Sequence, residues 1–87
     1  MILAKVIGNV VATRKDDSLI GYKLMIIKRI NATGNLIGDE EVAADYVGSG
    51  IGDIVLVGKG SAVRVHESHQ KVAIDMAIIG IVDTMDV

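Results

Sequence analysis

The sequence lacks several residues on which small proteins often depend. Its 87 residues include no cysteine, so a disulfide cannot stabilise the fold. Tyr22 and Tyr46 are the only aromatic residues, which argues against the stacking platforms that single-stranded nucleic acid needs. The apolar stretches are interrupted by Lys5, Asn9 and Asp75, and no stretch approaches the roughly 18 residues of a membrane span. We therefore expect neither nucleic acid nor a membrane as a partner.

The net charge bears on possible partners, and the first residues bear on the cellular location. A net charge of −2 gives no electrostatic attraction for nucleic acid or anionic lipid. Residues 1–5 show no basic stretch followed by a long apolar core, so they do not resemble a signal peptide. We expect a cytoplasmic protein.

Apolar residues, by contrast, are abundant for so short a chain. They make up 51% of the sequence, and the mean hydropathy is +0.49. A chain of this length forms one domain, here 1–87, and buries only about 60 to 65% of the surface exposed when unfolded. The chain has no disulfide and no dense cluster of metal ligands to stabilise so small a domain. We therefore expect oligomerisation to stabilise it, with apolar surface buried against another subunit.

The pattern of apolar residues predicts strands rather than helices. Isoleucine, valine, leucine and alanine occur in short runs separated by glycine. Ser61 is placed to cap a short helical turn over 62–64. About five strands with short connections favour an all-β fold, a small five-stranded OB-like closed barrel with one short helix. The expected strands are 2–13, 22–30, 39–46, 54–57 and 73–83.

Two motifs resemble a metal-binding and a phosphate-binding pattern, but each is incomplete. The segment His66-Glu67-Ser68-His69 has histidines three apart, whereas the zincin pattern needs four on a helix, so we interpret it as a polar loop. The glycines of 48–52 could turn successive amides toward a phosphate, but Asp53 and a strand follow in place of a Lys-Ser pair and a helix. We expect a tight turn there, with no cofactor and no metal.

Catalysis is not expected, because no nucleophile has a recognisable base partner and no acid and base pair is evident. Asp75 and Asp83 each interrupt the apolar strand predicted over 73–83. A buried carboxylate needs a cation or several donors. We therefore hypothesise that Asp75 pairs with Arg64 across a subunit boundary.

Six stretches cover nearly the whole chain and follow one another in a recognisable order: 4–15, 19–24, 45–53, 55–57, 60–64 and 74–83. Taken together they resemble the EutN/CcmL-type vertex proteins of bacterial microcompartments. The sequence differs from that family in lacking proline, with Ile30 and Ala73 where such proteins often carry one, and in having Ile54 where an aromatic is often found.

The resemblance implies a small β-barrel with a short helix that assembles into homopentamers. These would cap the five-fold vertices of a polyhedral shell whose other tiles are hexameric, a structural and not an enzymatic function. It also places the loop 48–52 near the five-fold axis, with Ser49 and Gly50 lining a pore and Gly48, Ile51 and Gly52 completing the axis loop. Charged residues beside apolar strands often set the register of a subunit contact. The candidates for that contact are Lys15, Arg64 and Asp75.

Two alternatives stay open at this point. A small oligomeric oxyanion-binding module of the molybdate type would use residues 60–64 to supply amides and a cation. A barrel that binds nucleic acid is less favoured, given the charge and the scarcity of aromatic residues.

Overall fold

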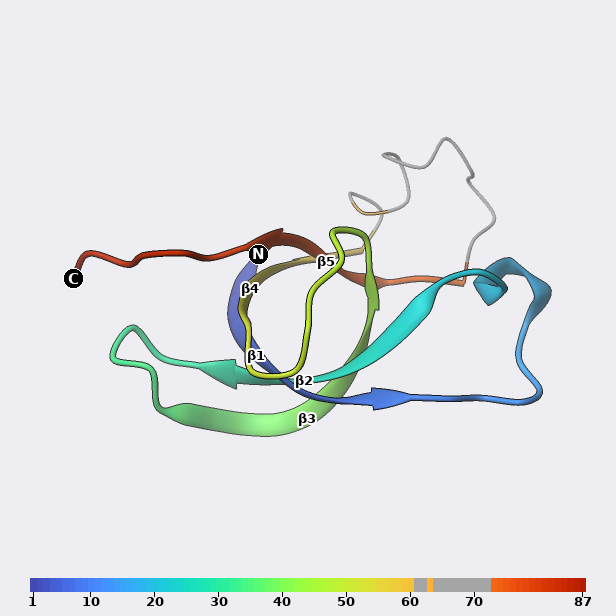
Figure 1. The fold of residues 1–87 in the computed structure, drawn as a ribbon, viewed down its shortest axis with the longest axis horizontal. Coiled ribbons are helices and arrows are strands. Elements are labelled where there is room, and N and C mark those ends of the chain that lie inside the picture. Colours follow the sequence, from blue (N-terminus) through green and yellow to red (C-terminus); the bar gives the residue numbers. More distant parts are fainter. Residues whose placement is uncertain (61–62, 64–72) are drawn as a thin grey trace.

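The computed structural model describes residues 1–60, 63 and 73–87. In this part of the chain five strands form a closed barrel in the order β1-β2-β3-β5-β4 (Figure 1). A short 3-10 helix, η1 (Asp17–Leu19), lies between the first two strands. The strands are β1 (Ile2–Val10), β2 (Lys23–Ile30), β3 (Leu36–Asp45), β4 (Ile54–Lys59) and β5 (Met76–Ile81).

The barrel closes through a short parallel pairing. β1 runs antiparallel to β2 and β4, and the β2–β3 and β4–β5 pairs are also antiparallel. β3 and β5 are parallel and pair at only two positions, Ala44 with Ala77 and Asp45 with Ile78. The remainder of β3, from Leu36 to Ala43, pairs with β2 alone among the described strands. The two strands that close the barrel therefore meet only near the end of β3.

The interior of the barrel is filled by alternate residues of all five strands, as a period of two requires. On the first strand Ala4 and Val6 face this interior, and both are fully buried. A bulge between Val6 and Gly8 then shifts the register with β2. The buried interior comprises Ala4, Val6, Met25, Ile27, Ala43, Val55, Val57, Met76 and Ile78.

A second apolar cluster packs on the outside of the barrel wall. Ala44 and Ala77 lie next in sequence to the interior residues Ala43 and Ile78 and point the other way, because successive side chains of a strand face opposite sides. The rings of Tyr22 and Tyr46 lie beside this cluster, with centroids 5.7 Å apart. Its buried members are Ala44, Val63, Ile74 and Ala77, with Leu19, Tyr22, Leu24 and Tyr46 packed against them.

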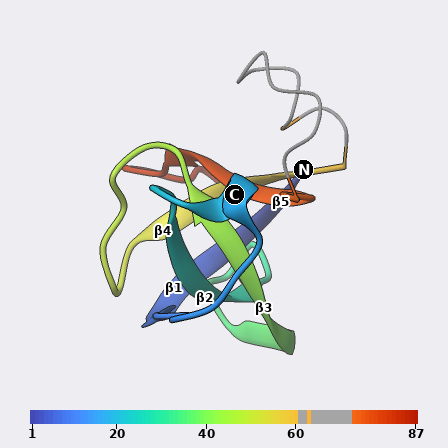
Figure 2. The same ribbon diagram turned by 90° about the vertical axis from the view of Figure 1, so that its right-hand side faces the viewer.

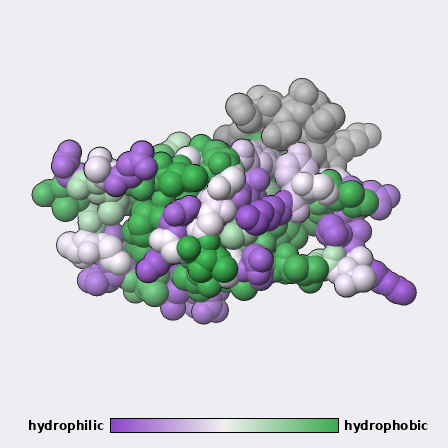
Figure 3. Space-filling model, viewed as in Figure 1, coloured by the Kyte–Doolittle hydropathy of each residue, from purple (hydrophilic) through white to green (hydrophobic). Residues whose placement is uncertain are grey.

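The hairpin formed by β2 and β3 extends past the closed part of the barrel (Figures 1 and 2). Residues 36–42 are all exposed in the protomer, whereas Ala43 and Ala44 are buried. The space-filling view shows apolar side chains interspersed with polar ones across one face of the molecule (Figure 3). The apolar surplus expected from composition is thus present on the surface.

The predicted all-β closed barrel is confirmed, and the errors lie at strand ends. The first strand ends at Val10 rather than 13, the third begins at Leu36 rather than 39, and the last covers only Met76–Ile81. The segment 14–21 contains η1, because the Asp16 carboxylate accepts a hydrogen bond from the Ser18 amide at 2.9 Å and caps it. The helical turn predicted at 62–64 lies outside the described residues except for Val63.

Candidate assembly surfaces

The glycine-rich loop after β3 is held by acidic side chains at both ends. The Asp45 carboxylate accepts from the Val47 and Gly48 amides, each at 3.1 Å, and Asp53 Oδ2 accepts from the Gly50 amide at 2.8 Å. Gly48 and Gly52 have φ angles of 78° and 98°, which residues with a Cβ rarely adopt. The predicted tight turn is present, and its shape depends on these two acids.

The same loop is joined to β1 and crosses in front of one open end of the barrel (Figures 1 and 2). The Val6 amide donates to the Asp53 carbonyl at 2.9 Å, and the Gly52 amide donates to the Val6 carbonyl at 2.8 Å. Lys23 Nζ donates to the Ser49 carbonyl at 3.4 Å. These contacts fix the loop relative to the barrel wall.

The two residues expected to line a pore occupy different environments from their neighbours. The Ser49 side chain is 1% exposed, and its hydroxyl has no hydrogen-bond partner among the described residues. Gly50 is half-buried, whereas Gly48 and Gly52 are exposed and Ile51 is 66% exposed. In this conformation Ile51 presents the accessible side chain of the loop, and Ser49 faces the protein interior.

The three residues chosen for a subunit contact are not brought together by any contact in the part of the chain described. Lys15 is exposed after β1, and its ammonium donates to the Ala12 carbonyl at 2.9 Å. Arg64 lies outside the described residues. Asp75 precedes β5 and is exposed, while its carbonyl accepts from the Gly60 amide at 2.7 Å.

One premise about the acids is therefore wrong. Asp75 and Asp83 do not interrupt the last strand, because β5 begins after the first and ends before the second. Both carboxylates are exposed in the protomer, so neither needs an internal cation. The proposed pairing of Asp75 with Arg64 loses its argument from burial.

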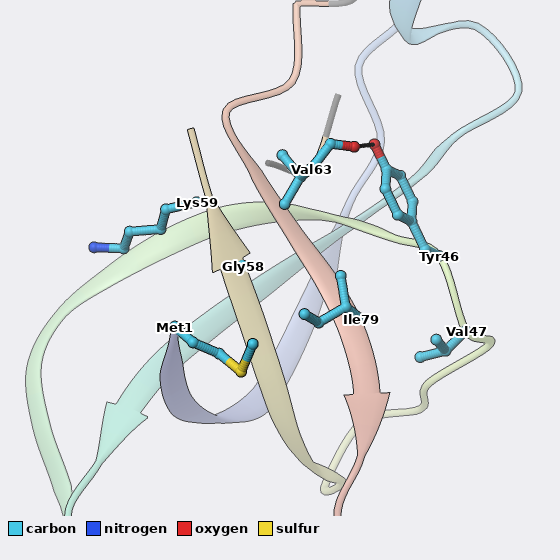
Figure 4. A pocket seen from close by; sticks show the side chains of 7 residues that line it. All are labelled: Met1, Tyr46, Val47, Gly58, Lys59, Val63 and Ile79. Carbon is cyan, nitrogen blue, oxygen red and sulfur yellow. Dashed lines mark hydrogen bonds between the residues drawn. The ribbon is translucent and has the colours of Figure 1, made fainter. Parts of the chain in front are cut away.

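An apolar groove that the sequence did not indicate lies over β4 and β5 (Figure 4). Its volume is about 430 Å³. Tyr46 lies at one side of it, with its hydroxyl donating to the Val63 carbonyl at 3.3 Å. Residues distant in sequence line it, which is why no local pattern revealed it. They are Met1, Tyr46, Val47, Gly58, Lys59, Val63 and Ile79.

No group of three metal-ligating side chains occurs within residues 1–60, 63 and 73–87. The histidine-containing segment 66–69 lies outside them. None of the helices described here is long and apolar enough to cross a membrane.

Residues 1–83 match the family model described as ethanolamine utilisation protein EutN/carboxysome. The chain belongs to the EutN/CcmL family. The predicted resemblance is thus confirmed over nearly the whole length.

Curated relatives match this EutN/CcmL-family protein over all or nearly all of its length. The bacterial microcompartment shell vertex protein PduN of Salmonella typhimurium is 47% identical, covering 98% of each chain. The carboxysome shell vertex protein CcmL of Nostoc sp. is 43% identical over all of this chain and 87% of that protein. These relatives are shell vertex proteins, and they give no support to the oxyanion-binding alternative.

A solved structure agrees with both sequence and fold. The GrpN pentameric microcompartment shell protein from Rhodospirillum rubrum superposes with a TM-score of 0.91 at 42% identity, covering all of this chain and 99% of that one. A carboxysome subunit, CcmL, reaches a TM-score of 0.93 at 40% identity. The closed five-stranded barrel is therefore shared with other members of the EutN/CcmL family.

Proposed function

We propose that this protein is a vertex subunit of a bacterial microcompartment shell and that it assembles as a homopentamer. The observation that carries this is its full-length similarity, in sequence and fold, to a shell protein described as pentameric. The role is structural. A sheet of six-fold tiles closes into a polyhedron only where five-fold units replace tiles at the corners, and these rings would supply them.

The surface of the protomer is suited to assembly. Large apolar side chains stay exposed in several regions, among them Val11 at 89% and Ile51 at 66%. Exposed apolar side chains gathered into larger patches mark interaction surfaces in soluble proteins. In a ring, each subunit presents one surface to one neighbour and a different surface to the other, and the contacts close when the rotation completes a circle.

The finer parts of this proposal concern partners and position. Hexameric shell tiles are the proposed outer partners, through individually weak contacts that act together. The loop 48–52 is proposed to approach the five-fold axis. Its exposed member Ile51 would then lie near its copies, while the backbone of Ser49 and Gly50 would shape any opening. Lys15, Arg64 and Asp75 stay the proposed charged contacts between subunits.

Native mass spectrometry of the purified protein across a concentration series tests the ring. We expect one dominant particle of five protomers, because a closed ring satisfies every contact and larger species gain none. A stable dimer, trimer or hexamer would contradict the vertex function.

The axis position can be tested separately with two matched substitutions. Ile51→Glu would place five carboxylates close together, so its rings should dissociate at low salt and recover at high salt, where charges are screened. Ile20→Glu is the control, since Ile20 is 65% exposed and lies in another loop. Equal behaviour of the two variants would remove Ile51 from the axis.

A further inference from the structure

Two features of the protomer are candidates for a contact with another subunit. One is the groove over β4 and β5, whose volume of about 430 Å³ falls within the roughly 300–1,000 Å³ typical of binding pockets. The other is the segment that follows β5. The first offers an apolar surface, and the second carries two apolar side chains, of which Val87 is 93% exposed.

The groove is apolar with one cation at its rim. Met1, Val47 and Ile79 place apolar side chains along it and are 78%, 39% and 39% exposed. Figure 4 shows Lys59 at the edge, with its ammonium directed away from the apolar side chains. A suitable occupant would combine apolar side chains with a nearby negative charge.

The segment 83–87 has that combination. Just before it, the Val82 amide donates a hydrogen bond to the Ile54 carbonyl at 2.8 Å. Beyond it the chain runs away from the barrel without pairing to another described strand (Figure 1). In an extended chain Met85 and Val87 point to one side and Asp86 to the other. Met85 is 38% exposed and Val87 93% exposed.

We propose that the segment 83–87 of one copy lies in the groove of the neighbouring copy. The inference rests on the proposed ring, to which it adds the contact that joins successive subunits. Met85 and Val87 occupy the apolar groove, and Asp83 or Asp86 approaches Lys59. Five extended residues span about 17 Å, so the segment projects well beyond its own barrel (Figure 1).

Charge favours this groove over the other large uncovered surface. The exposed part of β3 carries Asp39, Glu40 and Glu41, which would repel the acidic segment. The groove carries Lys59, which attracts it. The segment also begins beside Ile54, at the opposite end of β4 from Lys59 and about 17 Å from it, and from there it runs away from the barrel rather than toward Lys59 of the same protomer (Figure 1).

Disulfide trapping tests the contact, and the absence of native cysteine gives a clean background. Two double variants are made, Lys59→Cys with Asp83→Cys and Lys59→Cys with Asp86→Cys. A disulfide forms only when the two Cα atoms come within about 7 Å. We expect at least one variant to give a covalent ladder reaching five chains on oxidation. The matched control, Lys59→Cys with Asp39→Cys, should stay monomeric on a denaturing gel.

The outcomes separate this inference from the proposed function. Five-membered rings that form no ladder with either pair, or a ladder equally strong in the control, would overturn the contact and leave the vertex function intact. Failure to form five-membered particles in the unmodified protein would instead contradict the function.

Charge reversal gives a second, independent measurement. Lys59→Glu alone, or Asp83→Lys with Asp86→Lys, should raise the protomer concentration at which rings half dissociate by on the order of fivefold. Combining all three changes should restore assembly, because the charges are again opposite. Combined changes that weaken the ring as much as the separate ones together would argue against the pairing.

Discussion

β4 and β3 show how differently two strands of one small barrel can be covered. β4 pairs with β1 on one side and β5 on the other, and Val55, Val57 and Gly58 are buried. β3 is longer, yet its residues 36–42 are exposed and its outer edge pairs with β5 only at Ala44 and Asp45. Coverage, rather than strand length or apolarity alone, decides which strand contributes to the stability of the protomer.

The exposed part of β3 is also built differently in its charges. Asp39, Glu40 and Glu41 follow one another there, and charged residues discourage the association of unpaired strand edges. Glu40 lies opposite Lys28 on β2, a favourable cross-strand pair of unlike charges. This surface can therefore stay exposed to solvent or bind a basic partner, whereas β4 is buried in the barrel.

The largest expected effect comes from comparing two isoleucines, one in each environment. Ile27→Ala removes a side chain that is 1% exposed in the barrel interior and should cost about 2–5 kcal/mol. Ile37→Ala, at a side chain 40% exposed on β3, should cost about 0.5 kcal/mol or less. Urea unfolding at one fixed protomer concentration measures both. A similar loss at Ile37 would mean that β3 is covered by another subunit.

A second comparison concerns how tightly β4 is packed on its outer side. A Cβ on Gly58 would lie 2.8 Å from Val63 Cγ1 and 3.4 Å from Ile79 Cδ1, so Gly58→Ala overpacks this region and should cost about 1–3 kcal/mol. At Gly80 the nearest atom would be Leu56 Cδ1 at 3.5 Å, an ordinary contact. Thermal unfolding should show a clear fall in Tm for the first variant and little for Gly80→Ala.

A third comparison sets an acid that holds a loop against one on the exposed strand. Asp53→Ala removes the acceptor for the Gly50 amide and should cost about 1.5 kcal/mol. Hydrogen exchange at that amide should accelerate, because the bond that protects it is lost. Asp39→Ala serves as the control on β3 and should leave both quantities unchanged. Unchanged exchange at Gly50 in the first variant would show that other contacts hold the loop.

The smallest expected effect is at Asp16, which differs from the acids of β3 in having a local donor. Hydrogen bonds from the side chain and backbone of Ser18 lower the pKa of Asp16. A lowered pKa in the folded state stabilises the fold above the unfolded value, and that contribution is lost as the pH falls through the folded pKa. Asp16→Asn keeps an acceptor but removes this pH-dependent part. The unfolding free energy of Asp16→Asn should therefore be slightly lower than that of the parent near neutral pH.

Two measurements check this. Carboxyl NMR should report a pKa for Asp16 below the ordinary value near 3.9. The difference in unfolding free energy between Asp16→Asn and the parent should shrink as the pH falls below the pKa of Asp16 in the folded protein. A pKa at or above the ordinary value would contradict the capping hydrogen bonds.

Much of the fold could be predicted because strands leave a local signal. Short apolar runs separated by glycine predicted strands, and those expected from residues 2 and 54 are present as β1 and β4. The glycines at 48 and 52 predicted a tight turn, since positive φ angles favour that residue. Strand ends were less predictable, because they depend on where a partner strand stops.

The candidate surfaces were less accessible to such reasoning. Asp75 was interpreted as part of an apolar strand, but one position decides whether a carboxylate lies inside a strand or in the exposed bend before it. Nothing local marks Ser49 as buried and Ile51 as exposed. Nor does any short pattern bring Met1, Val47 and Ile79 to one groove.

The sequence by itself determined the all-β class, the barrel and, through the match over residues 1–83, membership of the EutN/CcmL family. Only the tertiary structure decided which apolar side chains are covered. Alternation states which residues share a face of a strand, and it does not state what lies across that face. The coverage of β4, the exposure of β3 and the groove beside Lys59 all depend on residues far apart in sequence, so they emerge only when the chain closes on itself.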